Sequence, residues 1–85
     1  MDTNNQTEIV ASFGKYIRQH RIEQKLSQAE VASSARISQN YLSELERGTK
    51  DPALSIAIRI CGALNTSIEA FLQHSQEPRL EETNV

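Results

Sequence analysis

Aromatic residues and cysteine are scarce in this chain of 85 residues, and each scarcity limits what the protein can be. Trp is absent, and Phe and Tyr occur only as Phe13, Tyr16, Tyr41 and Phe71, so a core has to be built mainly from Ile, Leu, Val and Ala. The single cysteine, Cys61, excludes an internal disulfide and points to a reducing compartment. A chain of this length allows one domain with a small core.

Long apolar runs are missing as well. No run approaches the roughly 20 residues that span a bilayer. The opening residues MDTNNQTE have neither the basic region nor the apolar segment of a secretory signal. We therefore expect no membrane partner and a location in the cytoplasm. Metal-ligand clusters, phosphate-binding loops and acid/base pairs at useful spacing are missing too, so we expect no enzyme activity, cofactor, metal or small-molecule ligand.

The stretch from Ser27 to Gly48 has the pattern of two short helices joined by a tight turn. Ser27 and Glu30 match a capping box, in which each side chain accepts a hydrogen bond from the other residue's backbone N–H. Ser38 is expected to cap the second helix, with Ile37 before it as a hydrophobic staple. Gly48 is expected to close that helix in the left-handed conformation. The pattern predicts a helix-turn-helix unit.

Apolar spacing predicts a long helix before this unit and an apolar helix after it. The first covers residues 8–25, with an apolar face at Ile9, Phe13 and Ile17. The apolar helix covers residues 53–64 and is hydrophobic almost all round, so we expect it to be the central packing element. Gly62 lies inside this helix, and we expect a close approach of another helix to compensate for its cost.

A fifth, short helix is expected over residues 68–74, with Thr66 or Ser67 as its cap. Residues 1–7 are polar and uncapped and are expected to form a flexible arm, and residues 76–85 form a polar, acidic tail. The domain is therefore expected to span residues 8–75. The predicted fold class is all-α, a compact five-helix domain.

The second helix of the unit has an outer face of hydrogen-bonding side chains that suits a DNA major groove. Gln and Asn can pair bidentately with adenine, and Glu can accept from cytosine N4. Glu44 can equally repel phosphate and act as a negative filter, and the whole face can be no more than a solvated helix surface. The predicted base contacts are Gln39, Asn40, Ser43 and Glu44.

Phosphate contacts are the second requirement, because half or more of protein–DNA hydrogen bonds go to the DNA backbone. Gln28 lies in the first turn of the first helix of the unit, where backbone N–H groups can share a phosphate with its amide. Tyr41 can reach a phosphate or serve in the core, and Arg18 and Arg36 can equally be solvated surface residues. The predicted phosphate contacts are Gln28, Ser38, Tyr41, Arg47, Lys50, Arg36 and Arg18.

The charge of the chain is weak for a DNA-binding protein but is unevenly distributed. The net charge is −2. Residues 15–51 carry seven Lys or Arg against five acidic residues, a net +2, so the acidic excess lies outside the predicted binding unit. Binding should therefore depend on directed contacts and on dimerisation.

Three segments, LSQAEVA, ISQNYLSELERGTKDP and LNTSIEAFL, together resemble the Xre/Cro/C1-type helix-turn-helix domain, which is lambda-repressor-like. The resemblance covers roughly residues 13–72 and implies five helices, with the second and third as the binding unit. It also implies a structural salt bridge between Arg21 and Glu46. The chain departs from the family pattern at Lys25 and Arg36, which stand where the family often has Gly, so both can require left-handed backbone.

These features predict a sequence-specific transcriptional regulator whose third helix reads double-stranded operator DNA as part of a homodimer. Ile68, Phe71 and Leu72 are the predicted dimer interface. The alternative is that they seal the monomer core, which suits Phe71 better than the other two. The competing function is a protein-interaction module on the same scaffold, such as an antitoxin-like or partner-binding regulator.

Overall fold

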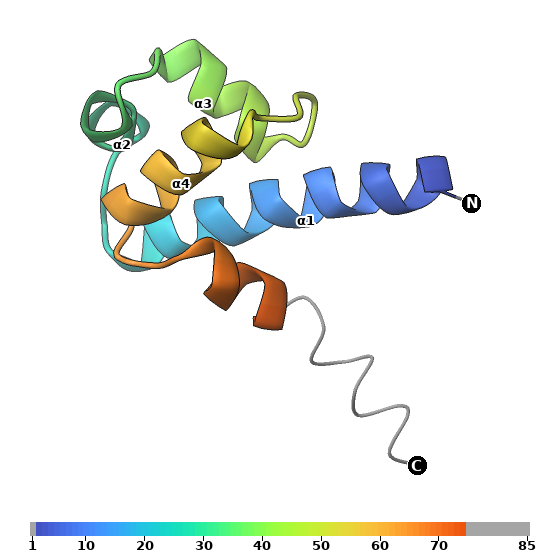
Figure 1. Ribbon diagram of the computed structural model, residues 1–85. Coiled ribbons are helices and arrows are strands. Elements are labelled where there is room, and N and C mark those ends of the chain that lie inside the picture. Colours follow the sequence, from blue (N-terminus) through green and yellow to red (C-terminus); the bar gives the residue numbers. More distant parts are fainter. Residues whose placement is uncertain (1, 75–85) are drawn as a thin grey trace.

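The computed structural model describes residues 2–74, with side chains from residue 7 onward. Within this range the chain forms five helices and the described residues contain no strand (Figure 1). Their bounds are α1 Asp2–Glu23, α2 Gln28–Ala35, α3 Gln39–Glu46, α4 Leu54–Ala63 and an unlabelled C-terminal helix, Ile68–His74. The all-α, five-helix prediction is confirmed. The expected tail, residues 76–85, lies outside the described residues.

The helices enclose one small aliphatic core. α2 packs against both α3 and α4, and α1 packs against α3. In Figure 1, α1 runs beneath α4, with α2 and α3 gathered above one end of it. The side chains that are almost completely buried come from all these helices and the turn after α4: Ile17, Val31, Leu42, Leu45, Ile60, Cys61 and Leu64.

α1 begins much earlier than the sequence suggested. Residues 2–7, expected to be a flexible arm, are the first turns of this helix. Once the packed part of a helix has formed, each added residue gains one backbone hydrogen bond without repeating the cost of nucleation. Weak local propensity was therefore a poor guide to where this helix begins.

α4 is not buried all round, which corrects the expectation that it is the central packing element. Ala57, Ile60 and Cys61 are buried, but Leu54 is 68% exposed and Ile58 is 53% exposed. The expected close approach at Gly62 is also wrong, since a Cβ there would meet no atom of the described chain within 4 Å. Such an approach occurs instead at Gly14, where a Cβ would overlap the carbonyl oxygen of Leu45.

The helix ends follow the local chemistry of the sequence. Ser27 and Glu30 form the predicted capping box, with distances of 3.0 Å from the Glu30 N to the Ser27 Oγ and 2.8 Å from the Ser27 N to the Glu30 Oε1. Ser38 caps α3 by accepting from the Tyr41 N at 3.0 Å. Ser67, rather than Thr66, caps the C-terminal helix.

Four of the residues that the structure describes adopt the left-handed backbone that the turns require. Gly48 has φ 78°, as predicted for the residue that closes α3. Lys25 and Arg36 both have φ 61°, which confirms that these two departures from the family pattern carry left-handed backbone. Asn65 has φ 59° in the turn after α4. In the range 2–74, no single helix is both long and apolar enough to cross a membrane.

Candidate nucleic-acid interface

The two sides of α3 differ sharply in burial. Leu42, Leu45 and Glu46 face inward and are buried. Gln39 and Asn40 occupy its first turn and are exposed. A short helix held by its buried side thus presents amide side chains from its N-terminal end, where a recognition helix meets base edges.

The other two predicted base contacts, Ser43 and Glu44, are half-buried one turn further along α3. Arg47, predicted to contact phosphate, donates from Nη1 to the Ser43 Oγ at 2.6 Å. The Ser43 hydroxyl therefore accepts from Arg47, which leaves its own hydrogen for an acceptor. Ser43 and Arg47 act as a pair in the free protein.

The remaining predicted phosphate contacts differ in how well their surroundings suit that role. Lys50 and Arg36 are exposed in the loops that follow α3 and α2. Arg18 is exposed on α1, beside a shallow hollow lined only by residues of that helix. Tyr41 is half-buried against the core, which supports its packing role, while its phosphate contact stays a prediction.

The predicted salt bridge between Arg21 and Glu46 is present and holds α3 to α1. The Arg21 Nε donates to the Glu46 Oε2 at 2.7 Å, and the Arg21 Nη2 donates to Oε1 at 3.0 Å. The side chain of Glu46 is 3% exposed and that of Arg21 is 14% exposed. The hydrogen bonds from Arg21 to Glu46 raise the pKa of this guanidinium above its ordinary value. The paired geometry fixes the end of α3.

Gln28 belongs to the same network, which the sequence did not reveal. It is half-buried at the start of α2, and its Nε2 donates to the Glu46 Oε1 at 3.0 Å. Its predicted phosphate contact therefore has to be made by an amide that already has one internal partner. The sequence marks Gln28 only by its position in the first turn of a helix, which says nothing of a contact eighteen residues away.

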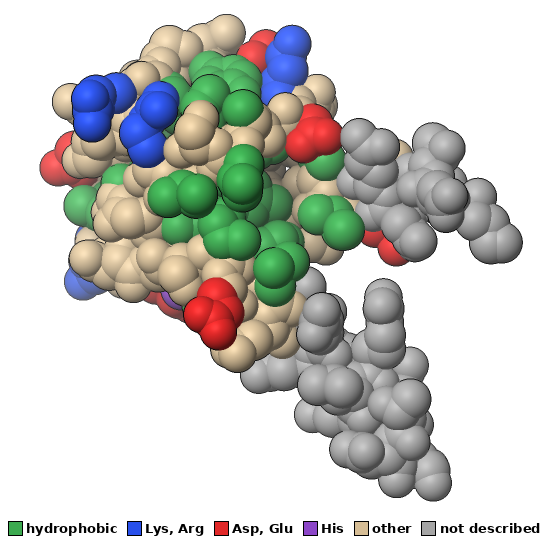
Figure 2. Space-filling view, viewed as in Figure 1, with side chains coloured by type: hydrophobic (Ala, Val, Ile, Leu, Met, Phe, Trp, Pro, Cys, Tyr) green, Lys and Arg blue, Asp and Glu red, His purple; other side chains and the backbone are tan. Residues whose placement is uncertain are grey.

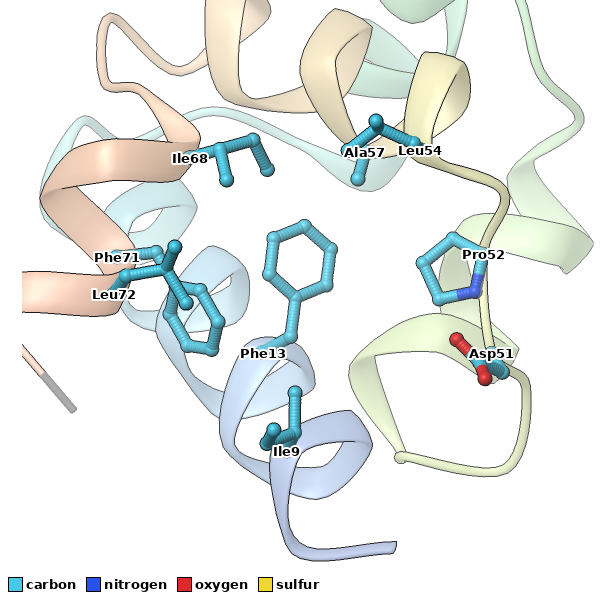
Figure 3. A pocket seen from close by; sticks show the side chains of 9 residues that line it. All are labelled: Ile9, Phe13, Asp51, Pro52, Leu54, Ala57, Ile68, Phe71 and Leu72. Carbon is cyan, nitrogen blue, oxygen red and sulfur yellow. The ribbon is translucent and has the colours of Figure 1, made fainter. Parts of the chain in front are cut away.

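A hydrophobic groove of about 240 Å³ is lined by side chains of α1, α4, the C-terminal helix and the loop before α4. Phe13 lies at the centre of the view in Figure 3, with side chains of the C-terminal helix on one side and those of α4 and the preceding loop on the other. The lining residues are Ile9, Phe13, Asp51, Pro52, Leu54, Ala57, Ile68, Phe71 and Leu72. Figure 2 shows hydrophobic side chains gathered across this region.

The three predicted interface residues differ in burial along this groove. Phe71 is 4% exposed and packs edge-on against Phe13, with ring centroids 5.2 Å apart, so it belongs to the core. Ile68 is half-buried and Leu72 is 43% exposed, so they form the accessible wall. The contribution of Ile9 to the groove was not predicted from the sequence. Its spacing placed Ile9 on the core face of the first helix, but its side chain is 55% exposed.

The helix-turn-helix family model HTH_3 matches residues 17–71, which include the whole of α2, α3 and α4. The chain belongs to the Xre/Cro/C1-type helix-turn-helix family. This membership agrees with the prediction that the protein is not an enzyme. Among the described residues, no group of three or more His, Cys, Asp or Glu side chains is placed to hold a metal ion.

Individual relatives match the same region. The chain is 41% identical over 59 residues to the transcriptional regulator ClgR of Mycobacterium tuberculosis, covering 69% of this chain and 53% of that protein. It is 36% identical over 61 residues to an immunity repressor protein of Bacillus phage phi105, covering 72% of this chain and 42% of that protein. The chain thus spans about half the length of the curated relatives it matches.

A solved structure shows the same architecture. The clp gene regulator ClgR from Corynebacterium glutamicum superposes with a TM-score of 0.75 at 28% identity, covering 89% of this chain and 84% of that chain. The similarity covers most of the chain. It supports the helix-turn-helix assignment of α2 and α3.

Proposed function

We propose that this protein is a sequence-specific DNA-binding transcriptional regulator. The observation that carries the proposal is the first turn of α3, where Gln39 and Asn40 are exposed while the far end of the helix is fixed by the buried pair Arg21–Glu46. A recognition helix needs both features, because base contacts are specific only when the helix has one orientation. The relatives named above are a transcriptional regulator and a repressor, which supports the same function.

Base reading is assigned to the outer face of α3. Gln39 and Asn40 can each donate to N7 and accept from N6 of an adenine. Ser43 accepts from Arg47, so its hydroxyl hydrogen suits a base acceptor such as guanine O6 or N7. Glu44 can accept from cytosine N4, or its charge can reject phosphate and thereby exclude incorrect registers.

Backbone contacts surround this face. Gln28, at the start of α2, and Ser38, at the start of α3, both lie at helix N-termini, where backbone N–H groups favour an anion. Arg47 and Lys50 follow α3, and Arg36 lies in the turn between α2 and α3. Arg18, on α1, is the least supported member of the set, because nothing in the structure brings it to the recognition helix.

Operator binding is proposed to require a homodimer formed across the hydrophobic groove. One unit reads only a few base pairs, so a two-fold dimer with half-sites about one helical turn apart supplies the missing affinity. Ile68 and Leu72 offer an accessible apolar wall, and Ile9 and Leu54 extend it. Phe71 supports this wall from beneath. Through the monomer–dimer equilibrium, DNA binding would then be controlled by the protein's own concentration in the cytoplasm.

The test compares base-reading variants with a surface control on the same scaffold. A duplex enriched from random DNA by the wild-type protein is titrated with a Gln39→Ala/Asn40→Ala variant and with Gln19→Ala, an exposed change on α1. We expect the double variant to lose at least tenfold in affinity for the enriched duplex, because each bidentate pair contributes about 1–3 kcal/mol. Gln19→Ala should bind normally. Equal binding by all three would contradict base reading by Gln39 and Asn40. A wild-type protein that enriches no duplex would contradict the proposed function and favour a protein-interaction module.

A further inference from the structure

Glu46 joins the end of α3 to the start of α2 through a partly buried network of hydrogen bonds. Its Oε2 accepts from the Arg21 Nε, and its Oε1 accepts from both the Arg21 Nη2 and the Gln28 Nε2. Arg21 also donates from Nη1 to the carbonyl oxygen of Leu26 at 3.0 Å. Both carboxylate oxygens therefore have partners inside the protein, and the side chain is 3% exposed. Any effect of Glu46 on a ligand at the surface has to pass through its partners.

Gln28 is the one partner that belongs both to this network and to the proposed DNA surface. A carboxylate only accepts hydrogen bonds, so Glu46 can bind the NH₂ end of the Gln28 amide but not its carbonyl. That fixes which end of the amide lies at 3.0 Å from Glu46. The NH₂ group has two hydrogens and Glu46 takes one of them. The second remains for another acceptor, and a phosphate oxygen is such an acceptor.

We infer that Glu46 is a positioning residue for phosphate binding, because it holds the Gln28 amide with its second N–H available to a DNA phosphate at the start of α2. The inference rests on the proposed function. The carboxylate of Glu46 then positions two parts of the DNA surface: the end of α3, through Arg21, and the phosphate contact at the start of α2, through Gln28. The orientation of the base-reading helix and the position of the protein on the DNA backbone therefore depend on the same side chain.

The experiment uses the full chain and a duplex enriched from random DNA by the wild-type protein. Each phosphate of a half-site is replaced in turn by a neutral methylphosphonate, and the affinity of every duplex is measured for wild type, Gln28→Met and Glu46→Leu. Glu46→Leu leaves no acceptor at position 46, so the Gln28 amide loses its partner there, whereas the carbonyl oxygen of a Glu46→Gln variant could still accept from both Gln28 and Arg21. Arg21→Lys is the control, because it disturbs the salt bridge while leaving Glu46 able to hold Gln28.

For wild type, we expect the methylphosphonate at the phosphate that meets Gln28 to cost roughly tenfold in affinity, since a hydrogen bond to a charged group is lost. The other proposed phosphate contacts should give penalties of their own, and the phosphate of Gln28 is the one whose penalty disappears in Gln28→Met. Gln28→Met and Glu46→Leu should bind the unmodified duplex more weakly. The methylphosphonate at the phosphate that meets Gln28 should then lower the affinity of neither variant any further. The salt dependence should stay near that of wild type, because a neutral amide releases no counterion. Arg21→Lys should keep the full methylphosphonate penalty despite its lower stability.

The opposite pattern would overturn the inference. If Glu46→Leu binds DNA and keeps the methylphosphonate penalty while Gln28→Met loses it, Gln28 acts without Glu46. If Gln28→Met keeps the penalty, the amide makes no phosphate contact. These outcomes leave the proposed function standing, whereas a wild-type protein that enriches no duplex would refute both.

A second measurement covers the case in which Glu46→Leu fails to fold. The two Nε2 protons of Gln28 are assigned by NMR in the wild-type protein, with Gln28→Met identifying the pair. On adding the enriched duplex, one proton should keep its free-state position and slow exchange, because it remains on Glu46, and the other should shift. If both protons shift and exchange rapidly, Gln28 leaves Glu46 on binding and the inference is wrong.

Discussion

Arg36 is the residue at which protein stability and DNA affinity should respond in opposite directions. Its backbone has φ 61° and ψ 46°, and its N–H closes α2 through the carbonyl oxygens of Ala32 and Ser33. Left-handed backbone costs a residue with a Cβ about 1–2 kcal/mol. Glycine avoids this strain but loses about 0.5–1 kcal/mol more in conformational entropy. Arg36→Gly should therefore raise the free energy of unfolding by about 0.5–1 kcal/mol, which denaturant titration can resolve.

The same change should weaken DNA binding. If Arg36 meets a phosphate, its loss removes one counterion-releasing contact, so the slope of log affinity against log salt should fall by about 0.9 in magnitude. Lys25→Gly is a matched control, because Lys25 has the same φ of 61° and the same charge but lies in the turn between α1 and α2. It should gain similar stability and keep the wild-type slope.

Two results would refute this reasoning. Equal losses of slope in Arg36→Gly and Lys25→Gly would mean that only bulk charge matters and that position 36 makes no directed contact. A fall in stability for both variants would mean that the left-handed backbone at these turns carries little strain.

Three further predictions follow from the packing. Gly14→Ala should destabilise the fold by about 2–3 kcal/mol, because the added Cβ overlaps the backbone of α3. Gly62→Ala, whose Cβ points into open space, should stabilise the fold by up to about 1 kcal/mol. Denaturation midpoints equal to that of wild type would contradict both predictions. Leu72→Glu should shift the protein toward monomer in sedimentation analysis and weaken operator binding, and an unchanged oligomeric state would argue against the groove as the dimer interface. Burial raises the pKa of the Cys61 thiol from 9.0 to about 11, so its contribution to stability is complete below pH 9 and is lost as the pH rises toward 11. The thiol of the native protein should therefore react with a labelling reagent far more slowly at pH 8 than the thiol of the denatured protein, and equal labelling rates would contradict this.

Local chemistry accounts for the parts of the fold that were predicted from sequence. The capping box of Ser27 and Glu30, the cap at Ser38 and the left-handed Gly48 each depend on a few neighbouring residues, and each is present. The pair Arg21–Glu46 was different, because it joins residues twenty-five positions apart. The family resemblance, rather than spacing, predicted it.

The features that sequence did not reveal depend on which helices become neighbours. In the sequence, Gly14 is only a residue of low helix propensity. Its lack of a Cβ is seen to be necessary once α3 is packed against it. The exposure of Leu54 and Ile58 follows from which side of α4 meets α2, and an almost uniformly apolar helix carries no signal for that choice. The contact between Gln28 and Glu46 requires both helix ends to be in place. The base and phosphate contacts themselves remain predictions.

Sequence selection from random duplex DNA at a stated salt concentration tests the central claim most directly, because it measures specificity and dimer geometry together. The account predicts an enriched two-fold symmetric site whose half-site centres lie about 10 base pairs, or one helical turn, apart. The symmetry should disappear, with weaker enrichment, when Leu72→Glu is used. A wild-type protein that enriches no sequence above the starting pool would contradict the claim that Gln39 and Asn40 read DNA.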